Sequence, residues 1–351
     1  MRPRGHGRAA HEVVGYDVRG GREVAPPMSH ETALAVTVVL PNYNGRELLA
    51  RFLPPVVAAA GAVSPPARIL VVDDASGDSS ADYLRAEWPD IDILTNDRNL
   101  GFGATANRGV EAARTPLVLL LNTDVEPAPG ALAPLIEVMR QRSQAGAAVP
   151  RITQTGEGGG CESVVFGAFR RGLLRLQRRP DLCDCDGPMP VLYPCAAAVM
   201  LRREIFLRLG GFDLLFAPFY WEDVDLGYRM WRAGYEVLYE PRSQVLHHHP
   251  GTVQTTQNDR RVRLVQDRNQ FLFMWKHLDR SLLAQHFALL PAHIIASAMT
   301  GRGRFVAAAF SALRALPATL RSRGELPHSL LSSREILERA RPQDGTHHAC
   351  E

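Results

Sequence analysis

The sequence predicts an α/β fold in which a mostly parallel central sheet is followed by amphipathic helices. Between residues 35 and 150, apolar runs alternate with helical segments, which is typical of right-handed βαβ units. The run at 117–121 has five apolar residues and no polar alternation, as expected of a strand buried on both faces. Polar turns follow these runs. Because the carboxyl ends of parallel strands meet at one edge, we expect the turns to share one crevice.

Four strands are predicted in this half, at residues 35–40, 68–72, 92–95 and 117–121. A helix is predicted after each of the first three, and the third helix runs to Ala113. The turns after the strands hold the candidate binding residues: Pro41, Asn42, Tyr43 and Asn44; Asp73 and Asp74; Asn99, Gly101 and Phe102; and Asn122, Thr123 and Asp124. The amides and carboxylates among them can bind the N–H groups of a base and the hydroxyls of a ribose.

Asp124, directly after the most apolar strand, is the candidate metal ligand. A carboxylate there offers a hard oxygen to Mg²⁺ or Mn²⁺ on a substrate diphosphate. An Asx-turn that closes the strand is the alternative. Gly101 and Gly103 do not complete a dinucleotide fingerprint, since the next glycine is Gly109, and no Walker-type loop is present. A nucleotide is still expected, bound by the acidic turns.

Length and composition indicate a globular chain. Its 351 residues, 46% of them apolar, can bury one large or two medium cores. The five cysteines are odd in number and unevenly spaced, which predicts no disulfide framework and a reducing compartment. The first thirty residues lack the apolar segment of a secretory signal, so the catalytic part is expected to be cytoplasmic. Residues 1–34 are expected to form a disordered tail, with Met28 as an alternative start.

A second group of carboxylates lies in segment 219–229. Glu222, Asp225 and Arg229 recur there at helical spacing and share a face, while Asp223 lies about 100° around the helix from Glu222. The simpler interpretation is that these acids mark the start of a helix, where the helix dipole favours negatively charged side chains.

Four motifs carry a resemblance to a known family. They are Pro41-Asn42-Tyr43-Asn44, Val71-Val72-Asp73-Asp74-Ala75-Ser76-Gly77-Asp78, Asn99-Leu100-Gly101-Phe102-Gly103 and Leu121-Asn122-Thr123-Asp124. In order and spacing, over roughly residues 35–325, they resemble family 2 inverting glycosyltransferases of the rhamnosyltransferase-like branch. The resemblance implies a GT-A domain over 35–257 that binds a nucleotide sugar, with Asp73 at the base or ribose and Asp124 in the metal motif. This branch typically has Asn-x-Asp, so Asn122 departs only from the broader family.

The resemblance also assigns roles on the acceptor side. The second acid of the Glu222-Asp223 pair, Asp223, is the general base, and Glu222 is its neighbour. Where the family usually has Gly, this chain has Cys195-Ala196-Ala197, so we expect the backbone there to approach the acceptor less closely. Asn107, in the helix after the third turn, is assigned to the donor site.

The triplet His247-His248-His249 supplies the last assigned ligand. The resemblance implies that a His here helps to hold the metal or the donor diphosphate, with His247 the best match and His249 the fallback. A zinc site formed with Cys183 and Cys185 is the alternative, but the spacing fits no standard zinc pattern.

Residues 258–325 form a basic region, with eleven Arg and Lys against three Asp between 258 and 323. The general preference for Arg makes a nucleic-acid site a poor explanation. An apolar stripe, namely Phe271, Leu272, Met274, Trp275 and Leu278, and an uncharged stretch at 281–300 predict helices that lie in the membrane interface. Packing of the stripe against the catalytic domain, or a membrane span over 281–300, are the alternatives. Residues 326–351 are expected to form a flexible tail.

These expectations describe an inverting glycosyltransferase on the cytoplasmic face of the membrane. The resemblance implies dTDP-rhamnose as the donor, Mg²⁺ or Mn²⁺ as the cofactor, and a lipid-linked saccharide of cell-surface polysaccharide assembly as the acceptor. UDP- and GDP-sugars are alternative donors. A sugar nucleotidyltransferase would need a Gly-rich phosphate loop after the first strand, where this chain has Asn42-Tyr43-Asn44. A non-catalytic membrane-surface protein would not need Asp124 together with the Glu222-Asp223 pair.

Overall fold

In the computed structural model, the described residues are 34–156, 160–248, 259–301, 303–326, 329 and 331–342. The tail predicted over 1–34, except its last residue, lies outside them, as do Met28, His249 and Cys350.

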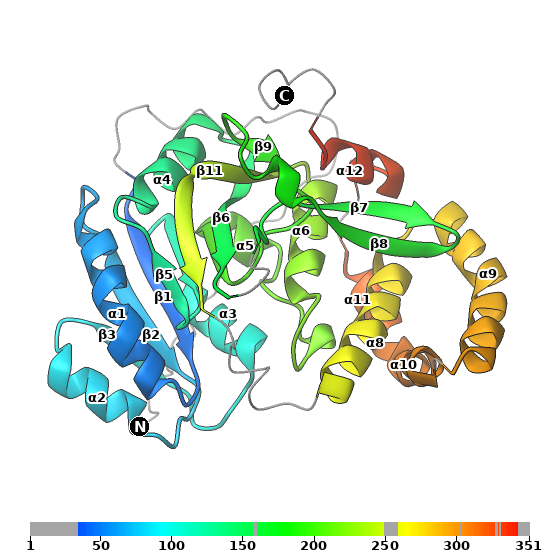
Figure 1. Ribbon diagram of the computed structural model, residues 1–351, viewed down its shortest axis with the longest axis horizontal. Coiled ribbons are helices and arrows are strands. Elements are labelled where there is room, and N and C mark those ends of the chain that lie inside the picture. Colours follow the sequence, from blue (N-terminus) through cyan, green and yellow to red (C-terminus); the bar gives the residue numbers. More distant parts are fainter. Residues whose placement is uncertain are drawn as a thin grey trace, which may run out of the picture. The chain divides into compact units, whose positions relative to one another are not determined.

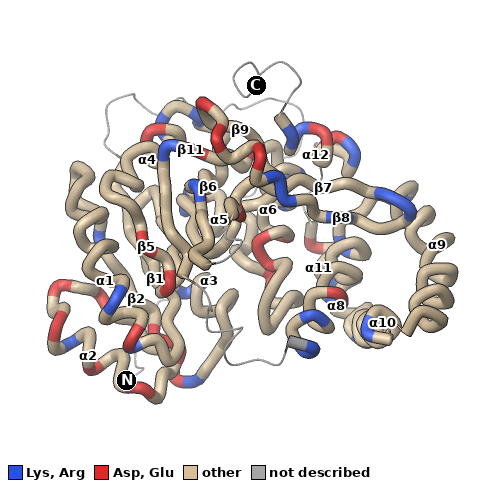
Figure 2. The backbone as a smooth tube through the Cα atoms, viewed as in Figure 1, with Lys and Arg blue, Asp and Glu red and all other residues tan. Residues whose placement is uncertain are grey.

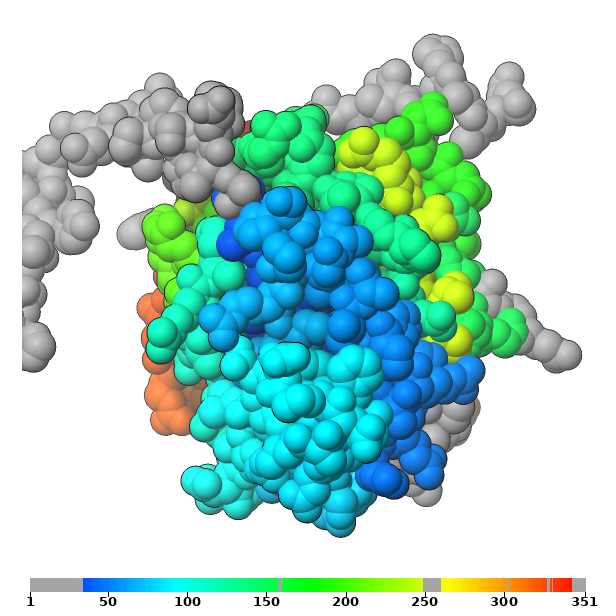
Figure 3. Space-filling view, turned by 90° about the vertical axis from the view of Figure 1, so that its left-hand side faces the viewer, coloured from blue at the N-terminus to red at the C-terminus, as the bar shows by residue number. Residues whose placement is uncertain are grey.

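The first half forms the predicted parallel sheet. Strands β1 (Val36–Asn42), β2 (Arg68–Asp73), β3 (Asp92–Thr95) and β4 (Leu117–Leu121) pair in the order β3-β2-β1-β4. Helices α1 (Arg46–Gly61), α2 (Ser80–Glu87) and α3 (Phe102–Ala112) connect them, as expected. Figures 1 and 3 show these units, coloured blue to cyan, side by side. The register sets Asn42 opposite Asp73 and Asp73 opposite Thr95, so the polar turns meet at one edge.

Close packing of α3 on the sheet depends on a glycine. A Cβ atom at Gly109 would overlap the side chains of Val39 and Val72. All five residues of β4 are buried, which confirms that this strand is covered on both faces.

The second half extends the sheet with strands of mixed direction. Strand β10 (Ala198–Arg202) lies antiparallel between β4 and β6 (Ala145–Gln154), and β11 (Glu236–His247) runs parallel to β6. The short strands β5 (Val125–Pro127) and β9 (Met189–Pro190) both pair with β11. Helices α4 (Leu132–Gln141), α5 (Arg203–Arg208) and α6 (Glu222–Arg232) complete this part, with 3₁₀ turns at Pro180–Leu182 and Leu214–Phe216. Because β5 begins directly after Asp124 and pairs His247 with Val125, the fold brings His247 to Asp124.

The C-terminal helices pack on this domain and on the hairpin of β7 (Val165–Arg170) and β8 (Leu173–Arg178) (Figure 1). They are α8 (Asp259–His277), α9 (Arg280–Met299), α10 (Gly303–Arg314), α11 (Leu316–Gly324) and α12 (Ser333–Arg339). The apolar stripe of α8 that we expected at the membrane is buried instead. The packing alternative holds for part of the stripe, since Met274 accepts from the Leu174 N–H of β8 at 3.4 Å, whereas Phe271 and Trp275 pack on Phe305 of α10 and Phe287 of α9.

Two further expectations differ from the structure. The chain beyond residue 325 is not uniformly flexible, since α12 starts at a capping box between Ser332 and Glu335 and buries Ile336 and Leu337. A disulfide joins Cys161 and Cys183, against the prediction of no disulfide. The spacing of the cysteines could not reveal this pair. The hairpin of β7 and β8 lies between the two residues in the sequence, and its fold brings them together.

Candidate active site

The ends of β1 and β2 hold a buried amide and carboxylate. The Asn42 amide nitrogen donates to Asp73 Oδ1 at 2.9 Å, and the Ser76 backbone N–H donates to Asp73 Oδ2 at 3.1 Å. Asn44 joins the two turns, since its Oδ1 accepts from the Gly77 N–H at 2.8 Å. Both of these partners of Asp73 are neutral, and its carboxylate oxygens are of the kind that accept hydrogen bonds from a base or a ribose.

Asp74 fastens the third turn to the second. Its carboxylate accepts from the backbone N–H groups of Leu100 and Gly101 at 2.8 and 2.9 Å, and from the Asn96 amide at 2.6 Å. The Asn99 side chain also accepts from the Gly101 N–H, at 3.1 Å. These bonds give Asp74 and Asn99 the task of shaping the loop before α3.

Asn107 connects α3 to the loop that precedes the acid pair. Its amide donates to the Phe212 carbonyl at 2.9 Å and accepts from the Phe212 N–H at 2.8 Å. The ring of Phe102 packs beside Phe212, with centroids 5.9 Å apart. Both polar atoms of Asn107 bind this backbone, so the side chain fixes the loop before the acid pair, and its assignment to the donor site stays a prediction.

Asp124 and His247 face one another, as the pairing of β5 with β11 requires. Asp124 Oδ1 lies 3.4 Å from His247 Nε2, and the His248 N–H donates to the Asp124 carbonyl at 2.9 Å. The Asn122 N–H donates to the Ala197 carbonyl at 2.9 Å, which fixes this turn against the segment just before β10.

Glu162 orients His247 and was not found from the sequence. Its Oε2 lies 3.0 Å from His247 Nδ1, so the imidazole is held between two carboxylates. Burial would lower the pKa of His247, but hydrogen bonds to Asp124 and Glu162 and their charges raise the pKa to about 9. A carboxylate behind a ligating histidine is the usual support of a metal-binding imidazole. No sequence pattern marks Glu162, because only the fold brings it to β11.

This donor set fits a divalent cation that is shared with a substrate. A carboxylate oxygen and the nitrogen of a neutral imidazole both suit Mn²⁺, and the oxygen suits Mg²⁺; a bound cation would displace the proton that the two carboxylates favour on His247. Within the described ranges, no group of three or more His, Cys, Asp and Glu side chains is arranged to hold a metal by itself. The remaining ligands would therefore be oxygens of the donor diphosphate and water.

The acid pair lies at the start of α6 on a strained backbone. Tyr220 and Trp221, directly before Glu222, have positive φ angles of 69° and 79°. The buried Asn269 of α8 holds this loop, because its amide donates to the carbonyls of Phe216 and Tyr220 at 2.7 and 2.8 Å. The C-terminal helices thus help to position the acid pair.

The two acids have different surroundings. Asp223 accepts from the N–H groups of Val224 at 2.8 Å and Ala196 at 3.5 Å, whereas Glu222 Oε2 has no partner among the described residues. Burial raises the pKa of both carboxyls, and the charge of Asp223 raises that of Glu222 further. Asp223 therefore ionises first and is the better base near neutral pH. The Ala196 N–H of the Cys195-Ala196-Ala197 segment contacts Asp223, and a less close approach of this backbone to the acceptor stays a prediction.

Asp225, one turn into α6, serves the fold. It is fully buried and binds Arg229 at 2.7 Å, Lys276 at 2.5 Å and His277 at 2.7 Å. Burial alone would raise its pKa, but the charges of Arg229 and Lys276 and the hydrogen bond from His277 hold the pKa well below the usual range. A carboxylate paired in this way is a poor proton acceptor.

Known proteins share this architecture. Residues 37–209 match the family described as Glycosyl transferase family 2. An N-acetylglucosaminyl-diphospho-decaprenol L-rhamnosyltransferase of Mycobacterium tuberculosis is 27% identical over 235 residues, covering 60% of this chain and 75% of that protein. A pre-mycofactocin glycosyltransferase of the same organism is 33% identical over 64% of this chain and 44% of that protein.

A solved structure supports the fold. GalNAc-T7, crystallised with UDP, GalNAc and Mn²⁺, superposes with a TM-score of 0.57 at 20% identity, over 71% of this chain and 49% of that one. It is a GT-A glycosyltransferase, and the mostly parallel sheet followed by C-terminal helices agrees with that architecture. The matched segment therefore identifies residues 37–209 as a glycosyl transferase family 2 domain, on a GT-A fold.

Proposed function

We propose that the protein is an inverting glycosyltransferase that moves a sugar from a nucleotide donor to a lipid-linked saccharide. One observation carries the proposal. The turn that ends in Asp124 and the candidate base Asp223 bind adjacent backbone groups just before β10. Ala197 accepts from the Asn122 N–H, and Ala196 donates to Asp223. A leaving diphosphate at Asp124 and an acceptor hydroxyl at Asp223 would therefore lie close to one another, as a direct transfer of the sugar requires.

Each residue has a definite task in this reaction. Asp73 and its turn would bind the nucleoside, while Asp124 and His247 would hold the cation. A bound divalent cation supplies neutralisation of the charge that develops on the leaving nucleoside diphosphate. Asp223 accepts the proton of the acceptor hydroxyl, whose oxygen attacks the anomeric carbon in line and inverts it.

The named relative gives the best proposal for substrates. The rhamnosyltransferase of M. tuberculosis is named for a diphospho-decaprenol acceptor. By its resemblance to the rhamnosyltransferase-like branch and its similarity to this relative, we assign dTDP-rhamnose as the donor and a sugar on a polyprenyl diphosphate as the acceptor; the motifs themselves do not fix the base or the sugar. Assembly of a cell-surface polysaccharide is the process that uses such an acceptor.

Membrane contact would occur through α9 and α10 on the cytoplasmic side. Among the described helices, α9 is the one long and apolar enough to cross a membrane, and little of it is buried. It carries no charged side chain after Arg280 (Figure 2), and Ile295 and Met299 are 59% and 82% exposed. His286 and Pro291 interrupt it, so we assign it to the membrane interface rather than to a span.

A screen of nucleotide release tests the function. The full-length protein is incubated with dTDP-rhamnose, UDP-sugars and GDP-sugars, together with membranes from a bacterium that makes polyprenyl-linked polysaccharide. We expect rapid release of dTDP and incorporation of rhamnose into the lipid fraction. Release of pyrophosphate from a nucleoside triphosphate and sugar phosphate would instead indicate a nucleotidyltransferase, and turnover of no donor would remove the proposal.

A further inference from the structure

The disulfide between Cys161 and Cys183 lies next to Glu162, the residue that orients His247. Cys161 directly precedes Glu162 in the chain, and Glu162 Oε2 lies 3.0 Å from His247 Nδ1. The carbonyl of Cys183 accepts from the Tyr239 hydroxyl of β11 at 2.7 Å, and β11 also carries His247. The disulfide therefore closes a ring of contacts that begins and ends on the strand of the candidate metal ligand.

Glu162 is held from two sides. Its backbone N–H donates to the Ile152 carbonyl of β6 at 2.9 Å, and the preceding residue, Cys161, is fixed by the disulfide. Arg178, at the end of β8, lies 3.7 Å from Glu162 Oε1. The disulfide lies just beyond the pair of Val165 and Arg178 at the base of the hairpin. It therefore fixes the separation of the two chain segments that meet at Glu162.

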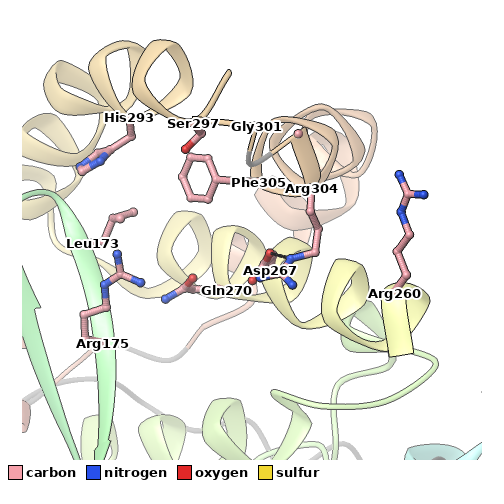
Figure 4. A pocket seen from close by; sticks show the side chains of 11 residues that line it. Leu173, Arg175, Arg260, Asp267, Gln270, His293, Ser297, Gly301, Arg304 and Phe305 are labelled. Atoms are coloured by element: carbon pink, nitrogen blue, oxygen red, sulfur yellow. Dashed lines mark hydrogen bonds and ion pairs between the residues drawn. The ribbon is translucent and has the colours of Figure 1, made fainter. Parts of the chain in front are cut away.

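The tip of the same hairpin is fixed by the C-terminal helices. The buried His286 of α9 binds the Gly172 carbonyl at 2.7 Å, and the Gln270 amide of α8 donates to the Leu174 carbonyl at 2.6 Å. Arg175 of β8 borders a cavity of about 620 Å³ that α8, α9 and α10 also line (Figure 4). Loss of the disulfide would therefore free the base of the hairpin and leave its tip in place.

The free cysteines among the described residues do not compete for this bond. They are Cys185 and Cys195, and burial raises the pKa of both thiols. The thiolate is the form that attacks a disulfide. Neither thiol is therefore expected to exchange with the Cys161–Cys183 bond near neutral pH, so opening of the bond requires an external reductant.

The proposed cytoplasmic location restricts the role of such a bond. Disulfides of cytosolic proteins are usually transient and either catalytic or redox-sensing. Neither Cys161 nor Cys183 belongs to the acid pair or to the candidate metal ligands, which argues against a catalytic disulfide. Its place beside Glu162 is that of a sensor which acts on the cation site.

From these observations we infer that the Cys161–Cys183 disulfide is a reversible redox switch of the cation site. The oxidised protein holds Glu162 against His247. In the reduced protein Glu162 is released, and the cation at Asp124 and His247 binds more weakly. This inference rests on the proposed function, because it regulates the cation site of that reaction.

The reductant is a dithiol. Cys161 is 8% exposed and Cys183 1%, so a thiolate of the reductant has its easier approach at Cys161. Attack forms a mixed disulfide with Cys161, and Cys183 leaves as a thiolate that takes up a proton. The second thiol of the reductant then displaces Cys161, which also takes up a proton. Two electrons pass to the protein, and the dithiol is oxidised to a disulfide.

Cation binding in defined redox states tests the switch without any transfer reaction. Mn²⁺ is titrated calorimetrically into the full-length protein, alone and with dTDP, before and after treatment with dithiothreitol and its removal under argon. Reduction should add two thiols by Ellman titration and weaken Mn²⁺ binding about tenfold or more. Reoxidation should restore the affinity, and the far-UV circular dichroism should not change, because the tip of the hairpin stays fixed.

Three variants identify the route of the effect. Cys183→Ser should bind Mn²⁺ as weakly as the reduced wild type, in both redox conditions. Cys185→Ser is the matched control two residues away, and it should respond to reduction as the wild type does. In Glu162→Gln the affinity should already be low, and reduction should lower it no further. A further loss in Glu162→Gln, as large as in the wild type, would show another route and overturn the inference.

Two other results would also overturn the inference. A disulfide that dithiothreitol leaves intact in the folded protein would be a purely structural crosslink, and so would one whose reduction leaves the Mn²⁺ affinity unchanged. Sugar transfer combined with equal Mn²⁺ affinity in the two redox states would contradict the inference alone. Redox-dependent Mn²⁺ binding, in a protein that transfers no sugar, would contradict the proposed function and leave the switch intact.

Discussion

The strand-end turns of the first half and the C-terminal helices use charge in opposite ways. In the turns, Asp73 and Asp74 are buried but accept hydrogen bonds from neutral amides and backbone N–H groups. In the C-terminal interface, Asp225 meets Lys276 and Arg229, and the charges neutralise one another. The comparison shows that the first arrangement surrounds its carboxylates with neutral donors that shape the turns, whereas the second pairs opposite charges for cohesion.

The two regions also differ in where apolar side chains lie. The strands of the first half bury theirs, while α9 and α10 expose Ile295, Met299 and Phe310. An exposed apolar surface of this kind needs an external partner. This exposed surface is the one through which we propose contact with the membrane.

The largest effect should come from the donor side. Asp124→Ala removes the carboxylate that would hold the cation, so we expect donor turnover, measured as nucleotide release, to be abolished with an unchanged unfolding midpoint. Asp92→Ala, which removes a carboxylate from the exposed pair with Arg68, should retain turnover. Full activity in excess EDTA would show that the metal is not required.

A large effect on stability should come from the C-terminal interface. Lys276→Met leaves the buried Asp225 with one fewer cation, so the free energy of unfolding should fall by about 3–5 kcal/mol. The matched control is Arg140→Met, which breaks an exposed pair with Glu137 and should cost less than about 1 kcal/mol. Equal losses by denaturant titration would contradict the cohesive role assigned to this cluster.

A moderate effect is expected behind the metal ligand. Glu162→Gln removes the charge that orients His247, so the affinity for Mn²⁺, titrated in the presence of the nucleoside diphosphate, should fall about 10–100-fold. Glu126→Gln removes the same charge from the neighbouring His248, which it binds at 2.8 Å, and should change the affinity little. If Glu162→Gln binds Mn²⁺ as tightly as Glu126→Gln and the wild type do, His247 needs no support from Glu162.

The smallest effect concerns membrane contact. Replacing Ile295 and Met299 together with Glu should move part of the protein from the membrane to the soluble fraction in sedimentation of a lysate. Leu214→Glu is the control, because Leu214 is an exposed apolar residue outside α9, and this variant should stay with the membrane as the wild type does. High salt alone should release only part of the wild type, because it screens charge but not apolar burial. A wild type that is wholly soluble beside membranes would exclude this contact.

Local signals explain what the sequence could predict. Apolar runs and polar turns gave the four strands and the clustering of Asn42, Asp73 and Asp124, because strand ends in a parallel sheet must converge. The C-terminal features escaped prediction because they depend on contacts between distant segments. The burial of the α8 stripe, the Cys161–Cys183 disulfide and the approach of Glu162 to His247 leave no local pattern. Asn107 matched a motif position, but only the fold shows its bonds to Phe212.

The central claim is that Asp223 is the base, and Asp223→Asn tests it most directly. The amide keeps the shape but cannot accept a proton, so transfer should fall about 10²–10⁴-fold while donor affinity changes little. Burial raises the pKa of Asp223, so wild-type kcat/KM should fall as Asp223 takes up a proton, at a pH above the ordinary aspartate value of about 4. Glu222→Gln should lose less activity than Asp223→Asn. Near wild-type transfer by Asp223→Asn, with loss in Glu222→Gln, would contradict the assignment.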